Sequence, residues 1–222
     1  MTTTTGSTRT DGHGGPTRRS VGSLGAGIVA GPALAAVSFA QIPFRDGFDM
    51  TRHAFSFLLI GPGGWVQVSN YVVAGALYAV AGHGLRRRMR GRSGRIAELA
   101  ATGLGAGLVV AGLFPPPPSF GDPAGAPAGA PGEVTTDAVV HRIGFGLGVL
   151  SLCTLLLTTA VWLWRRSRYG WATAGAITAL ALLTVPPTSG VQPYGTLWLY
   201  AAVTAGYVVV SALINRIRTL TD

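Results

Sequence analysis

The chain has 222 residues, of which 48% are hydrophobic and only 11% are charged, and its mean hydropathy is +0.42. A soluble domain carries about 25% charged residues to keep its surface in water, so this composition excludes a soluble enzyme or a disordered chain. Cys153 is the single cysteine, which excludes a disulfide scaffold. All 17 basic residues are arginines in short clusters between apolar runs. We therefore expect no nucleic-acid partner despite the net charge of +9.

The apolar runs instead predict an integral membrane protein. A helix needs about 20 apolar residues to cross roughly 30 Å of hydrocarbon. Six segments meet this requirement, at 21–40, 66–85, 96–114, 138–164, 171–187 and 195–214. Because the backbone in lipid must satisfy its own hydrogen bonds, we expect an all-α fold in which residues 21–215 form a bundle of six transmembrane helices.

The N-terminal segment precedes the first span. Residues 1–20 are rich in Thr, Gly and Arg and are predicted to form a disordered cytoplasmic tail. The basic pair at 18–19, the apolar run and the small residues at 38–40 also fit a signal peptide. The run of 20 apolar residues exceeds the usual 7–15 of such signals. We favour a retained span over a cleaved one, and the alternative stays open.

A polar patch is predicted between the first two spans. Residues 48–60 are expected to form a short outer interfacial helix that ends at the Gly-Pro-Gly-Gly segment 61–64. Four polar side chains share one face of it, because their spacings are three, four and seven. They are Asp49, Arg52, His53 and Ser56. The outer end of span two extends this patch with Gln67, Asn70 and Tyr71.

The arginines predict the orientation of the bundle. Three precede the first span, six lie between spans two and three, three follow span four and two follow span six, so 14 of 17 lie on one side. The positive-inside rule makes that side cytoplasmic. Both termini, including the tail at 216–222, are then cytoplasmic, and the protein is a multi-pass protein of the cell membrane.

The segment before span four adds a second polar pair. Residues 115–136 hold seven prolines and four glycines, which predicts an extended outer loop. Asp137 and His141 follow it at a spacing of four, with Arg142 adjacent. A carboxylate one turn from a histidine can hold its ring and favour the imidazolium form. Because both histidine–carboxylate pairs lie at the outer side, we expect them to converge.

Close helix packing is also expected. Three pairs of glycines have the four-residue spacing that lets helix backbones approach each other. They are Gly27 and Gly31, Gly103 and Gly107, and Gly144 and Gly148.

Several chemistries fit the outer patch. The pairs His53 with Asp49 and His141 with Asp137 are candidates for catalytic acid–base groups on a lipophilic substrate. Zinc is disfavoured because no compact ligand motif is present. Haem is disfavoured because His53 and His141 lie at the same membrane level and no second histidine pair lies at the opposite level. We expect no cofactor and no metal. The plain alternative is that these groups are interfacial caps and salt bridges, Asp49 with Arg52 and Asp137 with Arg142.

The sequence resembles a known family in specific motifs. These are Asp-Met-Thr-Arg-His at 49–53, Ile-Gly-Pro-Gly-Gly-Trp-Val-Gln-Val-Ser-Asn-Tyr at 60–71, Gly-Leu-Arg-Arg at 84–87, Ala-Gly-Leu-Phe at 111–114 and the histidine at 141. They resemble a family of bacterial six-span membrane proteins, abundant in actinobacteria, called domain of unknown function 998. The resemblance covers about residues 20–215 and implies a six-span architecture. The positions that match the family pattern are Arg52, His53, Gln67, Asn70 and His141.

The functional hypothesis is a membrane protein that handles a lipid or hydrophobic small molecule through the outer polar patch, as a binding or transport-accessory protein. In that case Arg52, Ser56, Gln67, Asn70, Tyr71 and Arg142 are the candidate ligand-binding residues. The first alternative is a membrane enzyme that uses His/Asp acid–base chemistry on an isoprenoid- or polyketide-like intermediate. A second is a structural partner subunit. The expected partners are membrane lipids and a hydrophobic small molecule; the sequence identifies no protein partner.

Overall fold

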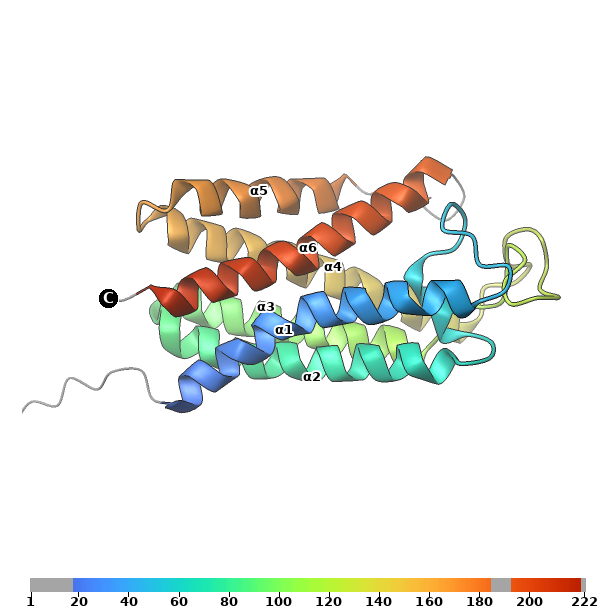
Figure 1. Cartoon of the computed structure of the whole chain (residues 1–222), viewed down its shortest axis with the longest axis horizontal. Helices are drawn as coiled ribbons and strands as arrows, with labels where there is room; N and C mark the ends of the chain where they lie inside the picture. The colour runs from blue at the N-terminus through green and yellow to red at the C-terminus, as the bar shows by residue number, and fades with distance from the viewer. Residues whose placement is uncertain (1–17, 185–192, 221–222) are drawn as a thin grey trace, which may run out of the picture.

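The chain folds into six long helices that run along one axis (Figure 1). This computed structural model describes residues 18–184 and 193–220, and the side chains of residues 22–184 and 194–220. The helices are α1 (Arg18–Gln41), α2 (Gly64–Met89), α3 (Gly91–Leu113), α4 (Thr136–Trp164), α5 (Tyr169–Leu183) and α6 (Pro193–Thr219). No β-strand occurs in these parts of the chain. The all-α prediction is confirmed, and most of the predicted tail at 1–20 lies outside the described residues.

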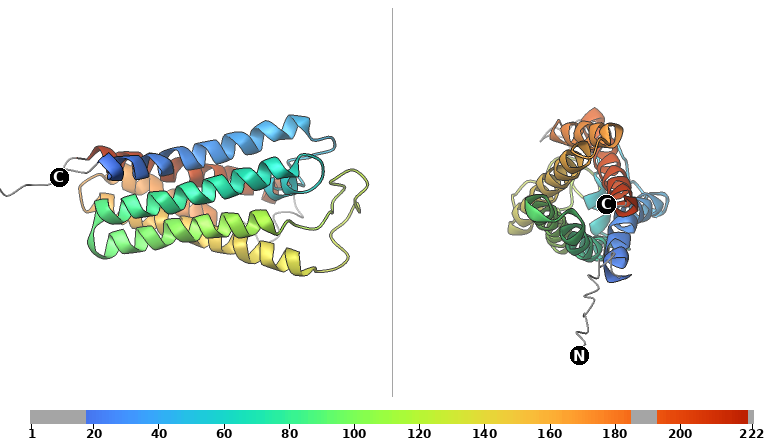
Figure 2. Two further views of the ribbon diagram at one scale, coloured as in Figure 1. Left: turned by 90° about the horizontal axis from the view of Figure 1, so that it is seen from below. Right: turned by 90° about the vertical axis from the view of Figure 1, so that its left-hand side faces the viewer.

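The helices form a ring of neighbours (Figure 2). Each of α1 to α4 packs against the next in sequence, and α6 closes the ring against α1 and α4. The shorter α5 packs only on the α4 and α6 side of this ring. Since consecutive helices are antiparallel, the α1–α2 and α3–α4 connections meet at one end of the bundle, and the α2–α3 and α4–α5 connections meet at the other (Figures 1 and 2).

Glycines let α3 and α4 approach at backbone distance. A Cβ added to Gly107 would lie 2.6 Å from the carbonyl oxygen of Gly144 and 2.6 Å from the nitrogen of Gly148. A Cβ at Gly144 would meet the nitrogen of Ala111 at 2.8 Å. The close packing expected from the four-residue glycine spacing is therefore realised between these two helices.

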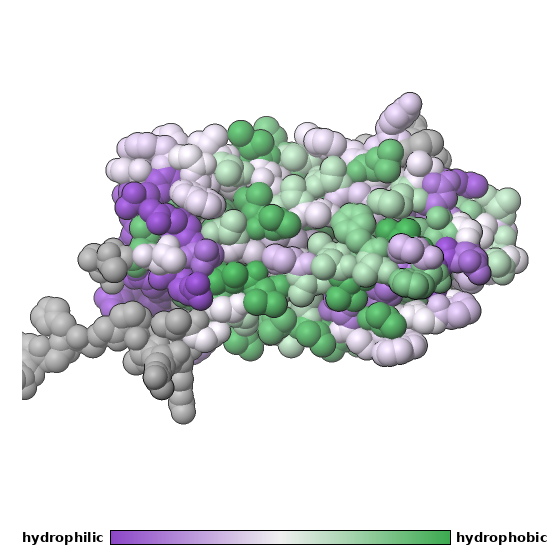
Figure 3. All heavy atoms as spheres, in the orientation of Figure 1, coloured by the Kyte–Doolittle hydropathy of each residue, from purple (hydrophilic) through white to green (hydrophobic). Residues whose placement is uncertain are grey.

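The surface divides into two ends and an apolar middle (Figure 3). One end, here called the arginine-rich end, carries residues 86–95, 165–168 and 216–218. The other, the loop end, carries the α1–α2 and α3–α4 connections. Large apolar side chains on the helices between them are well exposed, among them Leu99, Leu150 and Leu180 at 62–66%. An exposed apolar belt of this kind suits lipid rather than water.

Four helices are long and apolar enough to cross a membrane. They cover 22–44, 91–113, 136–164 and 194–219, and α5 is a shorter apolar helix. Helix α2 is long, but it carries Gln67, Ser69 and Asn70 near its start and three arginines in its last turn. The coarse prediction of a multi-pass helical membrane protein is thus supported by four of the six helices.

Two predicted boundaries differ from the structure. The arginine segment 86–95 is almost entirely helical, because α2 and α3 are separated only by Arg90, whose φ is +49°. The predicted interfacial helix at 48–60 is shorter: a single turn at 49–53 is followed by a 3₁₀ helix, η2 (Phe55–Leu59). The two are separated by Ala54 in an extended conformation, with ψ of 167°.

Candidate functional site

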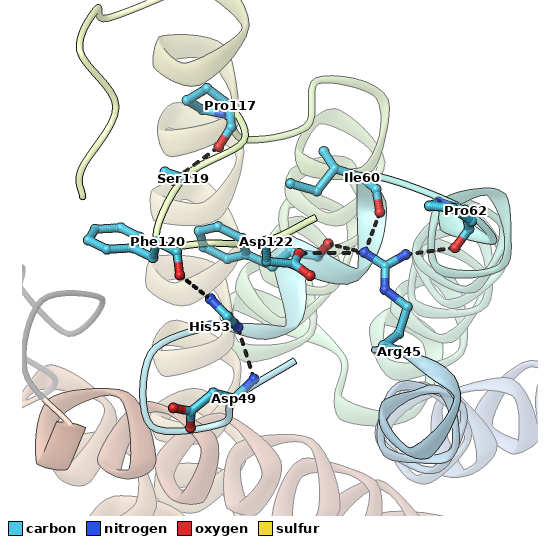
Figure 4. Close-up of polar contacts among 10 residues, drawn as sticks. Arg45, Asp49, His53, Ile60, Pro62, Pro117, Ser119, Phe120 and Asp122 are labelled. Carbon is cyan, nitrogen blue, oxygen red and sulfur yellow. Dashed lines mark hydrogen bonds and ion pairs between the residues drawn. The ribbon is translucent and has the colours of Figure 1, made fainter. Parts of the chain in front are cut away.

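Two connections form a cover over the loop end of the bundle. The cover consists of residues 42–63, with η1 (Ile42–Phe44) and η2, and residues 114–135. Arg45 joins them (Figure 4). Its Nη1 donates to the carbonyl of Pro62 at 2.7 Å, and its Nη2 donates to that of Ile60 at 2.5 Å and lies 3.5 Å from the carboxylate of Asp122. This contact between Arg45 and Asp122 is an ion pair, in which the Asp122 oxygen has no hydrogen-bond partner. The side chain of Arg45 is 10% exposed and that of Asp122 is 1% exposed.

His53 is a second connection within the cover (Figure 4). Its Nδ1 accepts the backbone N–H of Asp49 at 2.9 Å, and its Nε2 lies 3.0 Å from the carbonyl of Phe120. Because Nδ1 accepts and a carbonyl cannot donate, Nε2 carries the single proton and the ring is neutral. The ring is 2% exposed and packs beside Phe48 and Phe57. Both nitrogens are committed to the protein, which leaves none for a haem iron or a substrate.

Asp49 and Arg52 also serve the cover. The Asp49 carboxylate accepts the hydroxyl of Thr51 at 2.7 Å and its N–H at 2.8 Å. These hydrogen bonds, the side-chain one first, lower the pKa of Asp49. The exposed Arg52 donates to the carbonyl of Ala128 at 3.1 Å. The backbone of Asp49, rather than its carboxylate, meets His53, so the expected carboxylate–imidazolium pair is not what holds this ring.

The residues predicted at the start of α4 are separated from one another. Thr135 caps the helix by accepting the N–H of Ala138 at 3.2 Å, and Asp137 lies exposed in the first turn, where a negative charge favours the helix N-terminus. Arg142 is exposed as well. Across residues 22–184 and 194–220, ion pairs join neither Asp137 to Arg142 nor Asp49 to Arg52.

Gln67 and Asn70 belong to a buried amide network between α1 and α2. Gln67 is fully buried; its Nε2 donates to Ser38 at 2.9 Å and its Oε1 accepts from Gln41 at 2.6 Å. Asn70 donates to the same oxygen of Gln67 at 3.2 Å and to the carbonyl of Leu34 at 3.1 Å. These predicted ligand-binding side chains are occupied with protein partners and fix the register of the two helices.

A cavity lies below the cover, inside the loop end of the bundle. Its walls come from α1, α2, α3, α4, α6 and η2, and most of them are apolar. The polar side chains that line it are Ser38, Ser56, Tyr71, His141, Tyr200 and Tyr207. Ser56, Tyr71 and His141 were candidates from sequence, and the structure brings them to one space.

His141 is the histidine of this cavity. It is 8% exposed, and its Nδ1 lies 2.9 Å from the carbonyl of Ala111 and 2.9 Å from that of Phe114 at the end of α3. Two carbonyls can only accept, so Nδ1 carries the proton. In the neutral ring Nε2 is then an acceptor, and it has no partner among the described residues. His141 therefore differs from His53 in having one ring nitrogen available to a ligand.

The tyrosines of α6 were not identified from the sequence. Tyr200 donates its hydroxyl to the carbonyl of His53 at 2.6 Å and packs edge-on against Phe55, with ring centroids 4.4 Å apart. It thus links the cavity to the cover. Tyr207 lines the wall two turns further along the helix. The seven-residue spacing, which puts both on one helix face, was the available signal.

The described residues include several potential metal ligands. Within them, no three His, Cys, Asp or Glu side chains gather closely enough to hold a metal ion. Cys153 is buried and its thiol lies 3.8 Å from the carbonyl of Ala179. What the cavity offers chemically is a neutral imidazole and several hydroxyls in apolar surroundings.

Comparison with known proteins assigns the family. The family model described as "Protein of unknown function (DUF998)" matches residues 28–215. The chain belongs to this family, as the sequence motifs indicated, and the matched range includes the whole cover and every residue that lines the cavity. Neither the curated proteins nor the solved structures contain a match to the chain.

Proposed function

We propose that this member of the domain of unknown function 998 family is a cell-membrane protein that binds one lipophilic molecule in its cavity. The observation that supports this is the cavity itself, an apolar space inside the bundle that contains a histidine nitrogen and several hydroxyls. Ligand pockets typically combine a mostly apolar wall with a few polar groups that fix orientation. In this proposal the cavity, rather than the exposed pair Asp137 and Arg142, is the binding site.

The proposal includes six membrane crossings with the arginine-rich end in the cytoplasm. Helix α2 directs Gln67 inward and leaves Val72, Val73 and Val80 on its surface, 37–57% exposed. This inward placement of polar groups allows α2 to cross lipid although it is less apolar than the other long helices. A cysteine at Gly125 in the cover should then react with an impermeant reagent on intact cells, and one at Arg92 should not; the reverse pattern would refute the orientation.

Entry from the bilayer is favoured by the position of Phe145. This residue lines the cavity and is also 44% exposed on the side of the bundle. Phe145 therefore forms part of the wall between the cavity and the lateral surface of α4, and we place the entry route beside it. A molecule dissolved in lipid could enter without passing through water.

Gly148 provides the direct test of binding. It lines the cavity, and a Cβ added to it would meet only Leu104, at 4.0 Å, so a larger side chain there would occupy the cavity with little strain. Gly146 lies on the same helix with nothing within 4 Å of an added Cβ and does not line the cavity. Gly148→Leu and Gly146→Leu therefore form a matched pair.

The measurement is mass spectrometry of molecules that copurify with each variant in mild detergent. We expect a stoichiometric lipophile with the wild type and with Gly146→Leu, and its loss from Gly148→Leu at equal protein yield. An unchanged set of copurified molecules in all three proteins would refute binding in the cavity.

A second candidate function is catalysis in the same cavity. The specific observation is the arrangement of His141, in which two backbone carbonyls hold the Nδ1 proton and leave Nε2 as a base. A positioned histidine of this kind can remove a proton from a bound substrate. If so, His141→Gln should retain the copurified molecule but change its chemical form, because the unconverted substrate accumulates. The same compound in both proteins would argue for binding alone.

A further inference from the structure

We infer that the occupant of the cavity carries an uncharged hydroxyl group, as a lipophilic alcohol or phenol does, and that anionic and cationic lipids are excluded. This inference rests on the proposed binding function and adds the chemical class of the ligand. It follows from the charge, the hydrogen-bonding groups and the size of the cavity.

The cavity wall excludes charged head groups. No arginine or acidic side chain is among the described residues that line it, and the segment 185–192, outside the description, contains no charged residue in its sequence. Of the charged groups of the cover, Arg45 pairs with Asp122, Arg52 binds the carbonyl of Ala128 and Asp49 accepts from Thr51. The remaining two, Asp46 and Glu133, are exposed and do not line the cavity. A phosphate, carboxylate or ammonium would be buried without a counter-charge, which is strongly unfavourable.

The hydrogen-bonding groups favour a ligand that both donates and accepts. His141 presents Nε2 as an acceptor, so the ligand must donate to satisfy it. Within the described residues the hydroxyls of Ser56 and Tyr207 have no hydrogen-bond partner, and both residues line the cavity. A hydroxyl can donate to the imidazole and accept from such a group. An ether or ester carbonyl can only accept and would leave the histidine nitrogen unpaired.

The size of the cavity limits what is enclosed. Its volume is about 70 Å³, counted over positions that the centre of a water molecule can occupy. This exceeds the room that a single water needs, so the cavity can take a small chemical group. The space therefore suits a hydroxyl with the first few carbons attached to it. In this proposal the rest of the chain leaves beside Phe145 into the lipid.

Photoreactive probes can test this class directly. Four C16 chains carry the same diazirine on the fourth carbon and differ only at the end, which is a primary alcohol, its methyl ether, a carboxylate or a primary ammonium. Each is added at pH 8 to the purified full-length protein in mild detergent, and labelled peptides are identified by mass spectrometry. We expect labelling of the cavity peptides by the alcohol to exceed labelling by either charged probe by on the order of tenfold.

The ether isolates the contribution of His141. We expect it to label the wild type about threefold to tenfold less than the alcohol, the size of one hydrogen bond. In His141→Phe the alcohol should fall to the level of the ether, while unchanged ether labelling would show that the cavity is intact. Equal labelling by alcohol and ether in the wild type would overturn the hydroxyl assignment.

The outcomes separate this inference from the proposed function. If either charged probe labels the cavity as strongly as the alcohol, and Gly148→Leu blocks that labelling, the cavity binds lipophiles but the inferred class is wrong. If no probe labels the cavity above the level of Gly148→Leu, the binding function itself fails. Selective labelling by the alcohol that Gly148→Leu removes and Gly146→Leu retains supports both.

Discussion

The cover and the cavity each contain one histidine, and the two rings are held in different ways. In the cover, both nitrogens of His53 are bonded to backbone groups that come from two separate connections. In the cavity, one nitrogen of His141 is bonded to the end of α3 and the other faces no described partner. The cover histidine can stabilise structure but has no remaining capacity for a ligand. The cavity histidine combines a fixed orientation with an available acceptor.

The polar groups of the cover thus stabilise the fold, whereas those of the cavity are available to a ligand. The cover is polar because two irregular segments must satisfy their carbonyls, and Arg45 alone bonds to three of them. The cavity is mostly apolar, and its few polar groups are those that a ligand could reach. Substitutions of these polar groups should therefore affect stability in the cover and binding in the cavity. The predictions for Arg45 and the two histidines test that division, and the prediction for Gly107 tests the packing of the cavity wall.

The largest effect is expected from Arg45→Ala. It leaves the Asp122 carboxylate buried, at 1% exposure, without its counter-charge, which should lower the free energy of unfolding by about 3–5 kcal/mol. The midpoint of thermal unfolding in detergent measures this. Arg52→Ala removes an exposed arginine of the same cover and should cost less than about 1 kcal/mol. If both variants lowered the free energy of unfolding equally, the Arg45–Asp122 pair would not be the source of the stabilisation.

A smaller loss is expected from Gly107→Ala in the cavity wall. The new methyl would lie 2.6 Å from backbone atoms of Gly144 and Gly148, and backbone atoms within a helix cannot move singly. We expect about 2–3 kcal/mol of destabilisation from overpacking. Gly148→Ala, whose added methyl would meet only Leu104 at 4.0 Å, should be close to neutral in the same unfolding assay. A neutral Gly107→Ala would contradict the backbone contact of α3 with α4.

The two histidines can be compared with one substitution. His53→Phe keeps the ring but leaves the N–H of Asp49 and the carbonyl of Phe120 unpaired, so we expect about 2 kcal/mol of destabilisation with little change in binding of the alcohol probe. His141→Phe should cost about 1 kcal/mol and reduce alcohol binding several-fold. If His53→Phe reduced binding more than His141→Phe, the division between cover and cavity would be wrong.

The smallest effect concerns the charge of Asp49. Its pKa lies below the ordinary value of 3.8, first because of the Thr51 hydroxyl. A depressed pKa contributes stability that is complete above the unfolded value and is lost as the pH falls through the folded value. Thr51→Val should therefore unfold slightly earlier than the wild type at pH 6, by about one degree or less for so exposed a group. The difference should shrink as the pH falls through the folded pKa of Asp49; a difference that grows in acid would contradict the lowered pKa.

The helices follow closely from the sequence because apolar run length and helix breakers act locally. The predicted span 138–164 corresponds to α4 at Thr136–Trp164, and the span 66–85 to α2 at Gly64–Met89. The main error was local as well. The predicted face assumed a continuous helix over 48–60, whereas the extended Ala54 separates Ser56 from the turn that contains Asp49 and His53. Spacing arguments fail where one residue leaves the helical region.

The site was only partly predictable because its contacts are distant in sequence. His141 was identified, but nothing local indicates that its Nδ1 meets carbonyls of α3, or that His53 is bonded to Phe120, 67 positions later. Gln67 and Asn70 were interpreted as ligand-binding groups because they are polar in an apolar span. Their actual partners lie on α1. The cavity arises from the packing of several helices, which residue spacing within a single helix does not specify.

The contacts within the cover have a consequence for the biosynthesis of the protein. His53 and Arg52 bond to residues that are 67 and 76 positions further along the chain. At about 5–20 residues per second, the ribosome needs roughly 3 to 15 s to supply those partners after residues 52 and 53 are made. During that time the polar groups of residues 45–53 wait at the membrane surface without their final contacts. A nascent chain that stops before residue 120 therefore lacks the partners of both Arg52 and His53.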